Sequence, residues 1–412
     1  MSDHEAATGR FFARRRDFLK TSAFFGAGAL ASQAVLPAKA VAEQMGQSPA
    51  TKEAVPAAPA QHYGPAGVSP SVAEVYDKAR QALFPFCRVC PQCDGVACAG
   101  EYPGFGGAGS GMSFQNNFTA LQRVRLKLRA VNGVSSTDKK PDTSTVIFGH
   151  KLSLPALAAP IGGSGVNFGN RMPEAQYFDG IIGGSVDAGT LGAIGDGLGD
   201  PMDVIRRRYD VIARYQGKAI AGIKPHPQPN LISIIRLAEV ANAAMIMVDI
   251  DSAGRYKGNS RETMMEPKTV AQLRELVRTT KIPFIVKGIM TPEDALAARE
   301  SGAAGVVVSN HGGRVLDHTP GTAEVLPGIA DAVKGEMVIF VDGCVHYGHD
   351  VLKYLALGAD AVLVGRHLVR AVFGAGKQGV ALFFKTMREE LEAAMVVTAM
   401  PDVRSINRQI LA

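Results

Sequence analysis

Short runs of apolar residues recur eight times between residues 155 and 365, and most neighbouring runs are separated by a stretch long enough for a helix. Three such stretches are 231–241, 269–279 and 292–301. The eight runs, each a predicted strand, are Ala156–Ala159, Leu191–Ile194, Ala219–Ile223, Met245–Val248, Phe284–Val286, Gly305–Val308, Val338–Val341 and Ala361–Val364.

Alternating strands and helices predict an α/β fold with a parallel sheet, and eight units predict a closed (β/α)8 TIM barrel. A doubly wound open sheet is the alternative. Its dinucleotide fingerprint, G-x-G-x-x-G at the start of a helix, is not convincingly placed anywhere in the chain. The barrel is therefore the expected architecture, preceded by a cysteine-containing N-terminal extension.

Residues 1–40 have the features of an export signal. Arg15-Arg16-x-Phe18-Leu19-Lys20 precedes a weakly apolar run that is too short for a membrane span, and Ala38-Lys39-Ala40 supplies the small residues of a cleavage site. The pattern resembles a twin-arginine signal peptide, which implies the twin-arginine export machinery as a partner and a periplasmic or otherwise exported protein. The alternatives are an uncleaved anchor and an accidental basic helix.

Residues 41–70 are rich in Ala, Pro, Gln and Ser, and are predicted to form a flexible linker. Residues 71–114 begin with helical spacing of apolar side chains over Ser71–Leu83. They end in a Gly-rich loop, Gly100–Gly111, which either covers an active site or is a plain connector.

Four of the five cysteines lie between this helix and this loop, in the spacing C-x2-C-x2-C-x4-C: Cys87, Cys90, Cys93 and Cys98. Short spacings can present several thiolates to one point, so the segment is a candidate site for zinc or an iron–sulfur cluster. The sequence does not separate these two. Two disulfides, which an exported protein can form, and free thiols are the alternatives.

The composition is that of a large globular protein, with 412 residues of which 46% are hydrophobic and 20% charged. The net charge of +6 is modest, and no tract of Lys and Arg occurs beyond the N-terminus. A nucleic-acid partner is therefore not expected.

Charged residues follow the predicted strands, where the active site of a (β/α)8 barrel lies. The strand ends carry Gly162-Gly163, Asp196-Gly197, Lys224, Asp249, Lys287, His311 with Arg314, Asp342-Gly343 and Gly365-Arg366. The loops after the last two strands of such barrels often bind phosphate, so Asp342-Gly343 and Gly365-Arg366 are a candidate phosphate site.

The sixth predicted strand ends in Ser309-Asn310-His311-Gly312-Gly313-Arg314. A histidine can take a proton near neutral pH, and an arginine can hold a carboxylate or phosphate with two parallel hydrogen bonds. A base and an anion clamp three residues apart favour a catalytic site. The alternative is a capped turn with a structural histidine.

These residues carry a resemblance to the FMN-dependent α-hydroxy-acid oxidases and dehydrogenases. The motif Ser309–Arg314 with Leu316-Asp317 resembles the family signature, and Ile285–Ile289, Asp350–Ala359 and Val364–Arg366 agree in order and spacing. The likeness covers about residues 115–400. It implies that residues 115–412 form an FMN-binding barrel.

The resemblance also implies roles. His311 would be the base, Asp249 would pair with His311 and raise its pKa, and Arg314 would hold the substrate carboxylate. Lys287 would stabilise negative charge on the reduced flavin. The residues expected to bind FMN are Lys287, Ser309, Asp342, Gly343, Gly365 and Arg366.

Three departures from the family pattern concern ligand binding. The family has Asp-Gly-Gly-x-Arg after strand seven, whereas this chain has Asp342-Gly343-Cys344-Val345-His346, so a phosphate-binding arginine is replaced by His346. Strand three ends in Lys224 rather than Gln-x-Tyr, which suggests a more acidic substrate or a second charge near the flavin. No clear match exists for the substrate tyrosines, with Tyr102 and Tyr177 as the candidate replacements.

The expected function is FMN-dependent oxidation of a 2-hydroxy acid, such as lactate, to the 2-oxo acid. One alternative is a non-redox flavin isomerase of similar barrel type. Another is an electron-relay protein in which the cysteines carry electrons and the barrel site is degenerate. The sequence leaves the electron acceptor open among oxygen, a quinone and a protein, and we expect a homo-oligomer.

Overall fold

The computed structural model describes residues 70–101, 104–134, 140–253 and 265–412, and all of these belong to one compact unit. The predicted signal peptide, nearly all of the predicted linker, and Tyr102 lie outside the described residues. Among the helices of the described residues, none is long and apolar enough to cross a membrane.

The predicted barrel is confirmed. Eight parallel strands lie in the order β3-β10-β9-β8-β7-β6-β5-β4. The amide of Ala158 in β3 donates to the carbonyl of Leu191, just before β4, at 3.0 Å and so links the two ends of the sheet. The strands are β3 (Ala156–Ala158), β4 (Gly192–Ile194), β5 (Ala219–Ile223), β6 (Met245–Asp249), β7 (Phe284–Ile289), β8 (Gly305–Val308), β9 (Val338–Val341) and β10 (Ala361–Val364).

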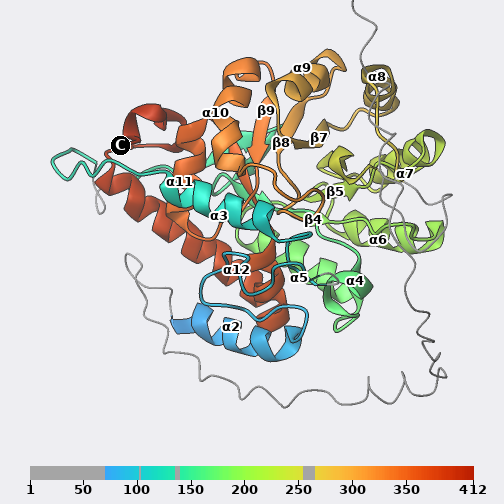
Figure 1. The fold of residues 1–412 in the computed structure, drawn as a ribbon, viewed down its shortest axis with the longest axis horizontal. Helices are drawn as coiled ribbons and strands as arrows, with labels where there is room; N and C mark the ends of the chain where they lie inside the picture. Colours follow the sequence, from blue (N-terminus) through green and yellow to red (C-terminus); the bar gives the residue numbers. More distant parts are fainter. Residues whose placement is uncertain (1–69, 102–103, 135–139, 254–264) are drawn as a thin grey trace, which may run out of the picture. The chain divides into compact units, whose positions relative to one another are not determined.

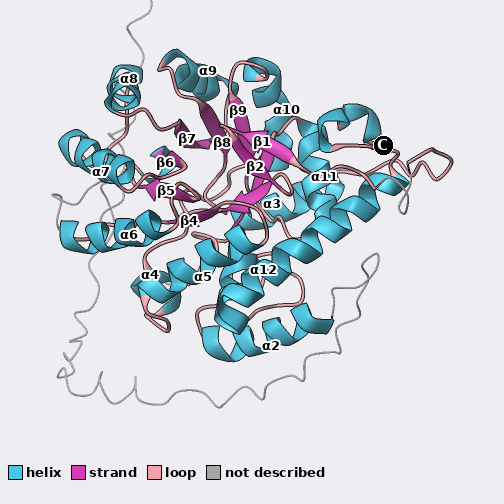
Figure 2. Ribbon diagram, turned by 180° about the vertical axis from the view of Figure 1, so that it is seen from behind, coloured by secondary structure: helices cyan, strands magenta, loops and turns pink. Residues whose placement is uncertain are grey.

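Helices surround the strands, which lie at the centre of the molecule in Figure 2. The barrel strands are buried almost throughout, as expected where a parallel sheet is covered on both faces. The helical segments from β3 onward are α4 (Ser164–Phe168), α5 (Glu174–Asp187), α6 (Met202–Arg214), α7 (Gln228–Val240), η1 (Ile250–Ser252), α8 (Val270–Thr279), α9 (Pro292–Glu300), α10 (Thr322–Val333), α11 (Gly348–Leu357), α12 (Arg366–Val397), η3 (Val403–Ser405) and η4 (Arg408–Ile410).

Local sequence explains where several of these helices begin. The side chain of Thr269 accepts a hydrogen bond from the amide of Gln272 and closes a capping box at the start of α8. The side chain of Thr291 accepts a hydrogen bond from the amide of Asp294 at the start of α9, and Pro292 takes the first helical position, where its missing N–H is not needed. The helix expected over 292–301 is confirmed to within one residue.

The N-terminal extension packs on the barrel. Helix α2 (Pro70–Leu83) lies against α12, and the apolar positions that predicted this helix are buried (Figure 1). Helix α3 (Met112–Arg123) packs on α10, and an antiparallel hairpin of β1 (Thr145–Ile147) and β2 (His150–Leu152) precedes the barrel.

Helix α12 departs from a single regular helix. The backbone angles of Ala375 and Gly376 are not helical, and Gly376 has a φ of 55°, a value that glycine adopts readily. The first segment of α12 therefore ends at this break. It begins directly after β10, so its N-terminus is at the rim of the barrel where the predicted site lies.

Candidate active site

A cavity of about 540 Å³ opens at the C-terminal ends of the strands, a size common for small-molecule sites. Asp249 and Ser309 do not line the cavity. Asp249 contacts Lys224 and Ser309 contacts Lys287, and both lysines line the cavity. The predicted residues that line the cavity are Lys224, Lys287, His311, Arg314, Asp342, Gly343, Gly365 and Arg366. The strand-end residues Gly162, Gly163, Asp196 and Gly197 also line it, so the structure brings together residues from seven strand ends.

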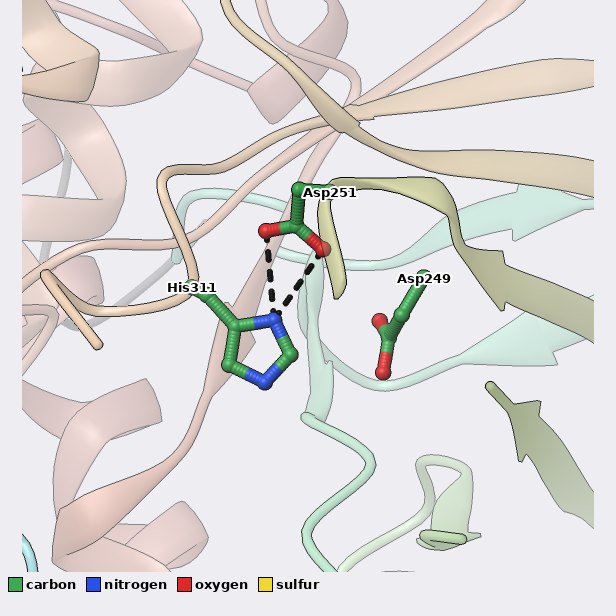
Figure 3. A group of neighbouring side chains, drawn as sticks. All are labelled: Asp249, Asp251 and His311. Atoms are coloured by element: carbon green, nitrogen blue, oxygen red, sulfur yellow. Dashed lines mark hydrogen bonds and ion pairs between the residues drawn. The ribbon is translucent and has the colours of Figure 1, made fainter. Parts of the chain in front are cut away.

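His311 is held from both sides of its ring. Its Nδ1 atom lies 3.1 Å from each carboxylate oxygen of Asp251 (Figure 3). Its Nε2 atom lies 3.2 Å from Nζ of Lys224. The amide of His311 donates to Oγ of Ser309 at 3.0 Å, which fixes the start of the loop.

The expected pairing of His311 with Asp249 is corrected by this geometry, because the hydrogen-bonded carboxylate is that of Asp251. Asp249 is nearby, since one oxygen of each carboxylate and one ring nitrogen of His311 lie within 4.8 Å of one another. The physical reason is position. Asp249 is the last residue of β6, where two lysines contact its oxygens, whereas Asp251 lies in the turn η1 beyond the strand.

The expected direction of the His311 pKa is also corrected. Burial, together with the cations of Lys224 and Lys287, holds the pKa of His311 well below its ordinary value, although Asp249 acts in the opposite direction. A neutral ring protonated on Nδ1 satisfies both contacts, because Nδ1–H donates to Asp251 and Nε2 accepts from Lys224. His311 therefore lies in the cavity as a neutral imidazole.

Asp249 is a buried anion between two lysines. Nζ of Lys224 donates to its Oδ2 atom at 2.8 Å, and Nζ of Lys287 lies 3.2 Å from its Oδ1 atom. Burial would raise the pKa of Asp249, but the two ammonium groups bring it below its ordinary value. Burial would likewise lower the pKa of Lys287, but Asp249 and Asp342 raise it. Asp249 and Lys287 therefore both carry their charges.

Lys224 uses its hydrogen-bond donors on protein groups. Besides Asp249 and His311, it contacts Oγ of Ser252 at 3.2 Å. An ammonium group has three donors, so these contacts account for all of them. The predicted contact of Lys224 with an acidic substrate stays a prediction.

Arg314 lines the same cavity as His311. Its Nη2 atom donates to Oδ1 of Asn167 at 2.8 Å, and its guanidinium carbon lies 5.9 Å from the centre of the Phe105 ring. Phe105 belongs to the Gly-rich loop and also lines the cavity, so this residue contributes to the cavity wall.

The ends of β9 and β10 meet at the cavity, where the sequence predicts a phosphate site. Gly343 and Cys344 have positive φ values of 112° and 58°, and both line the cavity together with Gly365 at the start of α12. Turn amides and helix N-termini bind phosphate. A Cβ atom on Gly343 would lie 2.5 Å from Oγ1 of Thr322, so the close turn requires glycine.

Arg366 supplies a cation at this end. Its guanidinium lies 3.9 Å from the centre of the Phe114 ring and donates to the carbonyls of Phe105 and Gly312 at 2.9 Å each. Together with Lys287 and the turn amides, it forms a set of donors that suits a phosphate and an anionic planar ring. The residues present therefore fit FMN.

His346 does not take the place of the missing arginine in the cavity. Its ring stacks on His367, with the ring centres 3.7 Å apart, and only His367 of the two lines the cavity. Burial lowers the pKa of His346 to about 3, so it is neutral near pH 7 and supplies no cation for a phosphate.

Tyr177 is not a substrate ligand. It is 2% exposed and packs on Phe168, with the ring centres 4.9 Å apart, and it is absent from the cavity lining. The buried position explains this, because Tyr177 lies on the face of α5 that is turned toward the core.

All five cysteines are described, and none is in a disulfide. Cys93 lines the cavity, and its sulfur accepts a hydrogen bond from Nη2 of Arg370 at 3.0 Å. No three cysteine sulfurs lie within 4.8 Å of one another in the described residues. The metal site at these cysteines stays a prediction.

A buried ionic network at one side of the cavity was missed from the sequence. Arg208 in α6 contacts Glu174 at 2.8 Å and Asp196 at 3.0 Å, and also Asp200. Nε2 of His226 lies 2.6 Å from Asp196. Asp196 was visible as a strand-end residue, but a single arginine in an amphipathic helix gave no signal that it is buried.

The fold defines a (β/α)8 barrel, and its cavity at the C-terminal ends of the strands is lined by His311, Lys287 and Arg366. The chain belongs to the FMN-dependent dehydrogenase family, whose model matches residues 104–174 and 209–412. This agrees with the resemblance carried by the motif Ser309–Arg314 after β8, and members of the family are FMN-dependent oxidoreductases.

Relatives with assigned names are similar to this chain in sequence. A 2-hydroxyacid oxidase of Dictyostelium discoideum is 44% identical over 150 residues, which cover 36% of this chain and 39% of the relative. A peroxisomal (S)-2-hydroxyacid oxidase of Arabidopsis thaliana is 28% identical over 74% of this chain and 89% of its own length. An L-lactate dehydrogenase of Yersinia pestis is 48% identical over 32% of this chain and 34% of its own length.

Solved structures of mandelate oxidase are similar over most of the barrel. One with (S)-2-phenylpropionate has a TM-score of 0.66 and 26% identity, and covers 83% of this chain and 97% of that chain. Another, which carries an FMN adduct, has a TM-score of 0.63 and 29% identity, and covers 77% of this chain and 98% of that chain.

Proposed function

We propose that the protein oxidises a 2-hydroxy acid to the 2-oxo acid with FMN, His311 as the base and Arg314 as the carboxylate clamp. One observation carries the proposal: both side chains come from the loop after β8 and line one cavity that also holds a phosphate-type donor set. FMN, when bound, supplies the two-electron acceptor. Lys287, Ser309, Asp342, Gly343, Gly365 and Arg366 would hold it.

The base is poised as a neutral imidazole. Nε2 of His311 is the atom that takes the proton, and Nδ1–H stays on Asp251, which stabilises the charged ring once it forms. Lys224 retains Asp249 and Ser252 as acceptors when its contact with Nε2 is released. Asp251 thus takes the role that the resemblance gave to Asp249, while Asp249 holds the two lysines.

The carboxylate clamp explains the class of substrate. A guanidinium can bind a carboxylate through two parallel hydrogen bonds, and Arg314 stands three residues after the base. A substrate held at its carboxylate would have its 2-position next to His311. The names of the relatives, which include lactate dehydrogenase and 2-hydroxyacid oxidase, support the same class.

Anaerobic titration of the flavoprotein with a panel of 2-hydroxy acids tests this function. Bleaching of the flavin by at least one acid is expected. A flavin that stays oxidised with every acid would favour the two alternatives, a non-redox isomerase or an electron-relay protein with a degenerate barrel site. The same titration, followed by oxygen, a quinone or a protein acceptor, identifies the electron acceptor.

Export by the twin-arginine route is proposed from the sequence of residues 1–40. Replacing Arg15 and Arg16 by lysine should leave the precursor in the cytoplasm, as fractionation and immunoblotting would reveal. Unchanged delivery of this variant would contradict the proposal. The proposed homo-oligomer is tested separately by light scattering of the purified protein.

A further inference from the structure

Arg370 is a buried cation with no carboxylate partner. The residue is 3% exposed, and no carboxylate of the described residues lies within ion-pair distance of it. Its Nη1 atom donates to the carbonyl of Cys90 at 3.4 Å and its Nη2 atom to the sulfur of Cys93 at 3.0 Å. Its Nε atom has no hydrogen-bond partner.

A buried, unpaired guanidinium is costly unless an anion lies beside it. The groups that surround Arg370 are the cysteine segment and Tyr76, whose ring centre lies 6.0 Å from the guanidinium carbon. Tyr76 is committed elsewhere, because its hydroxyl contacts Nδ1 of His367 at 3.0 Å. The cysteine segment is therefore the group next to Arg370 that could supply the negative charge to balance it.

We propose that Cys87, Cys90, Cys93 and Cys98 ligate a [4Fe–4S] cluster whose net negative charge is balanced by Arg370. Disulfides and protonated thiols are neutral and would leave the guanidinium without a counter-ion. Four thiolates around a metal centre are anionic. This proposal explains the C-x2-C-x2-C-x4-C spacing as a ligand set, whereas the proposed chemistry of the barrel uses none of these cysteines.

The sulfurs as they lie do not form the tight group that a single tetrahedral zinc ion requires. Tetrahedral zinc with Zn–S bonds of about 2.3 Å requires its sulfurs to lie about 3.8 Å apart. No three of the cysteine sulfurs are within 4.8 Å of one another in the part of the chain that the structure describes. A four-iron cluster is larger than one ion and holds its thiolates further apart.

The position of the site relates it to the barrel. Arg366 and Arg370 are four residues apart on α12, so they share one face of the helix, and the first lines the cavity while the second contacts Cys93. Cys93 itself lines the cavity. The cluster would therefore form part of the cavity wall, beside the place proposed for FMN.

The first test is metal and sulfide analysis of the full chain, produced and purified without oxygen. About four iron atoms and four acid-labile sulfides per chain are expected, with an electron paramagnetic resonance signal after reduction by dithionite. Zinc without sulfide, two intact disulfides by mass spectrometry, or four unmetallated thiols would each overturn the proposal. None of these readouts depends on oxidation of a hydroxy acid, so the proposed function can fail independently.

Variants then assign the ligands. Cys90→Ser and Cys98→Ser should lose most of the iron and sulfide, whereas Cys344→Ser, which changes the one cysteine outside the motif, should keep both. Loss of iron from Cys344→Ser, or its retention in both motif variants, would show that the ligand set is wrong. Circular dichroism of each variant identifies any that fail to fold, and the wild-type analysis stands without them.

Arg370 is tested as a positioning residue through the reduction potential of the cluster. Arg370→Met removes the cation beside the thiolates and should make the potential more negative, whereas Arg370→Lys keeps the charge and should stay closer to wild type. Equal potentials in all three proteins would show that Arg370 does not balance the charge of the cluster. A purely structural role would give no such difference between Met and Lys.

Discussion

Nζ of Lys224 lies 3.2 Å from Nε2 of His311, the atom proposed to take the substrate proton. The same ammonium group donates to Asp249 at 2.8 Å, so it is held in place by a buried carboxylate. A cation next to a base disfavours the protonated form of that base. Lys224 therefore keeps His311 neutral and available below the pH at which an ordinary histidine would be protonated.

Lys224→Met should shift the pH dependence of flavin reduction. The pKa of His311 is below its ordinary value because of burial first and Lys224 second, so removing this cation raises it. The acid limb of kcat/KM, which reports the free enzyme, should move to higher pH. Stopped-flow reduction between pH 5 and 8 measures the shift. Lys385→Met, which removes an exposed lysine of α12, is the control, and an unmoved limb in Lys224→Met would refute the role.

His311→Asn should slow flavin reduction by roughly 10²–10⁴-fold, the usual contribution of a general base. Flavin content should be unchanged, because His311 is not part of the proposed phosphate site. His318→Asn is a matched control, since both histidines have positive φ values, 59° and 61°, which asparagine tolerates. Reduction at the wild-type rate in His311→Asn would mean that another group is the base.

Arg314→Lys should lower kcat/KM for the 2-hydroxy acid more than it lowers flavin binding. Lysine keeps the charge but loses the planar pair of donors that holds a carboxylate. A charge-assisted hydrogen bond contributes about 1.5–3 kcal/mol, which corresponds to a fall of roughly 10- to 150-fold. Steady-state kinetics measure it. An unchanged kcat/KM would place the substrate carboxylate elsewhere.

Arg366→Ala should weaken FMN retention by a similar factor, because it removes a cation from the end of the cavity formed by Gly343 and Gly365. Release of flavin during dialysis, followed by fluorescence, measures the loss. Arg274→Ala, which breaks an exposed ion pair with Glu300, is the control. If both variants retain FMN equally, the phosphate is bound by other groups.

The free energy of unfolding should fall as the pH drops from about 6.5 toward 3. Burial lowers the pKa of His346 to about 3, so over this range the unfolded chain binds a proton that the folded chain does not. One such histidine changes the free energy of unfolding by about 1.4 kcal/mol per pH unit. His346→Gln should reduce this slope in denaturant titrations, whereas His318→Asn should leave it unchanged.

The barrel could be predicted from the sequence because its strands are buried on both faces and therefore form continuous apolar runs. The residues that follow each strand were equally visible, and most of them line the cavity. The pairing of His311 with Asp251 was not visible, because it depends on the turn that η1 makes after β6. The buried positions of Arg208 and Arg370 were also hidden, since a charged residue in a helix ordinarily faces solvent.

Hydrogen bonds hold the loop that carries His311 and Arg314 against the N-terminal extension. The amide of Ala108 donates to the carbonyl of Gly313 at 2.7 Å, and the hydroxyl of Ser110 donates to Asp317 at 2.7 Å. The cysteine segment is thus not an independent module that could be transplanted onto another barrel of this family. A graft would have to include these hydrogen bonds and Arg370. A barrel that began at residue 115 would lose the contacts of Ala108 and Ser110 that hold the loop of His311 and Arg314.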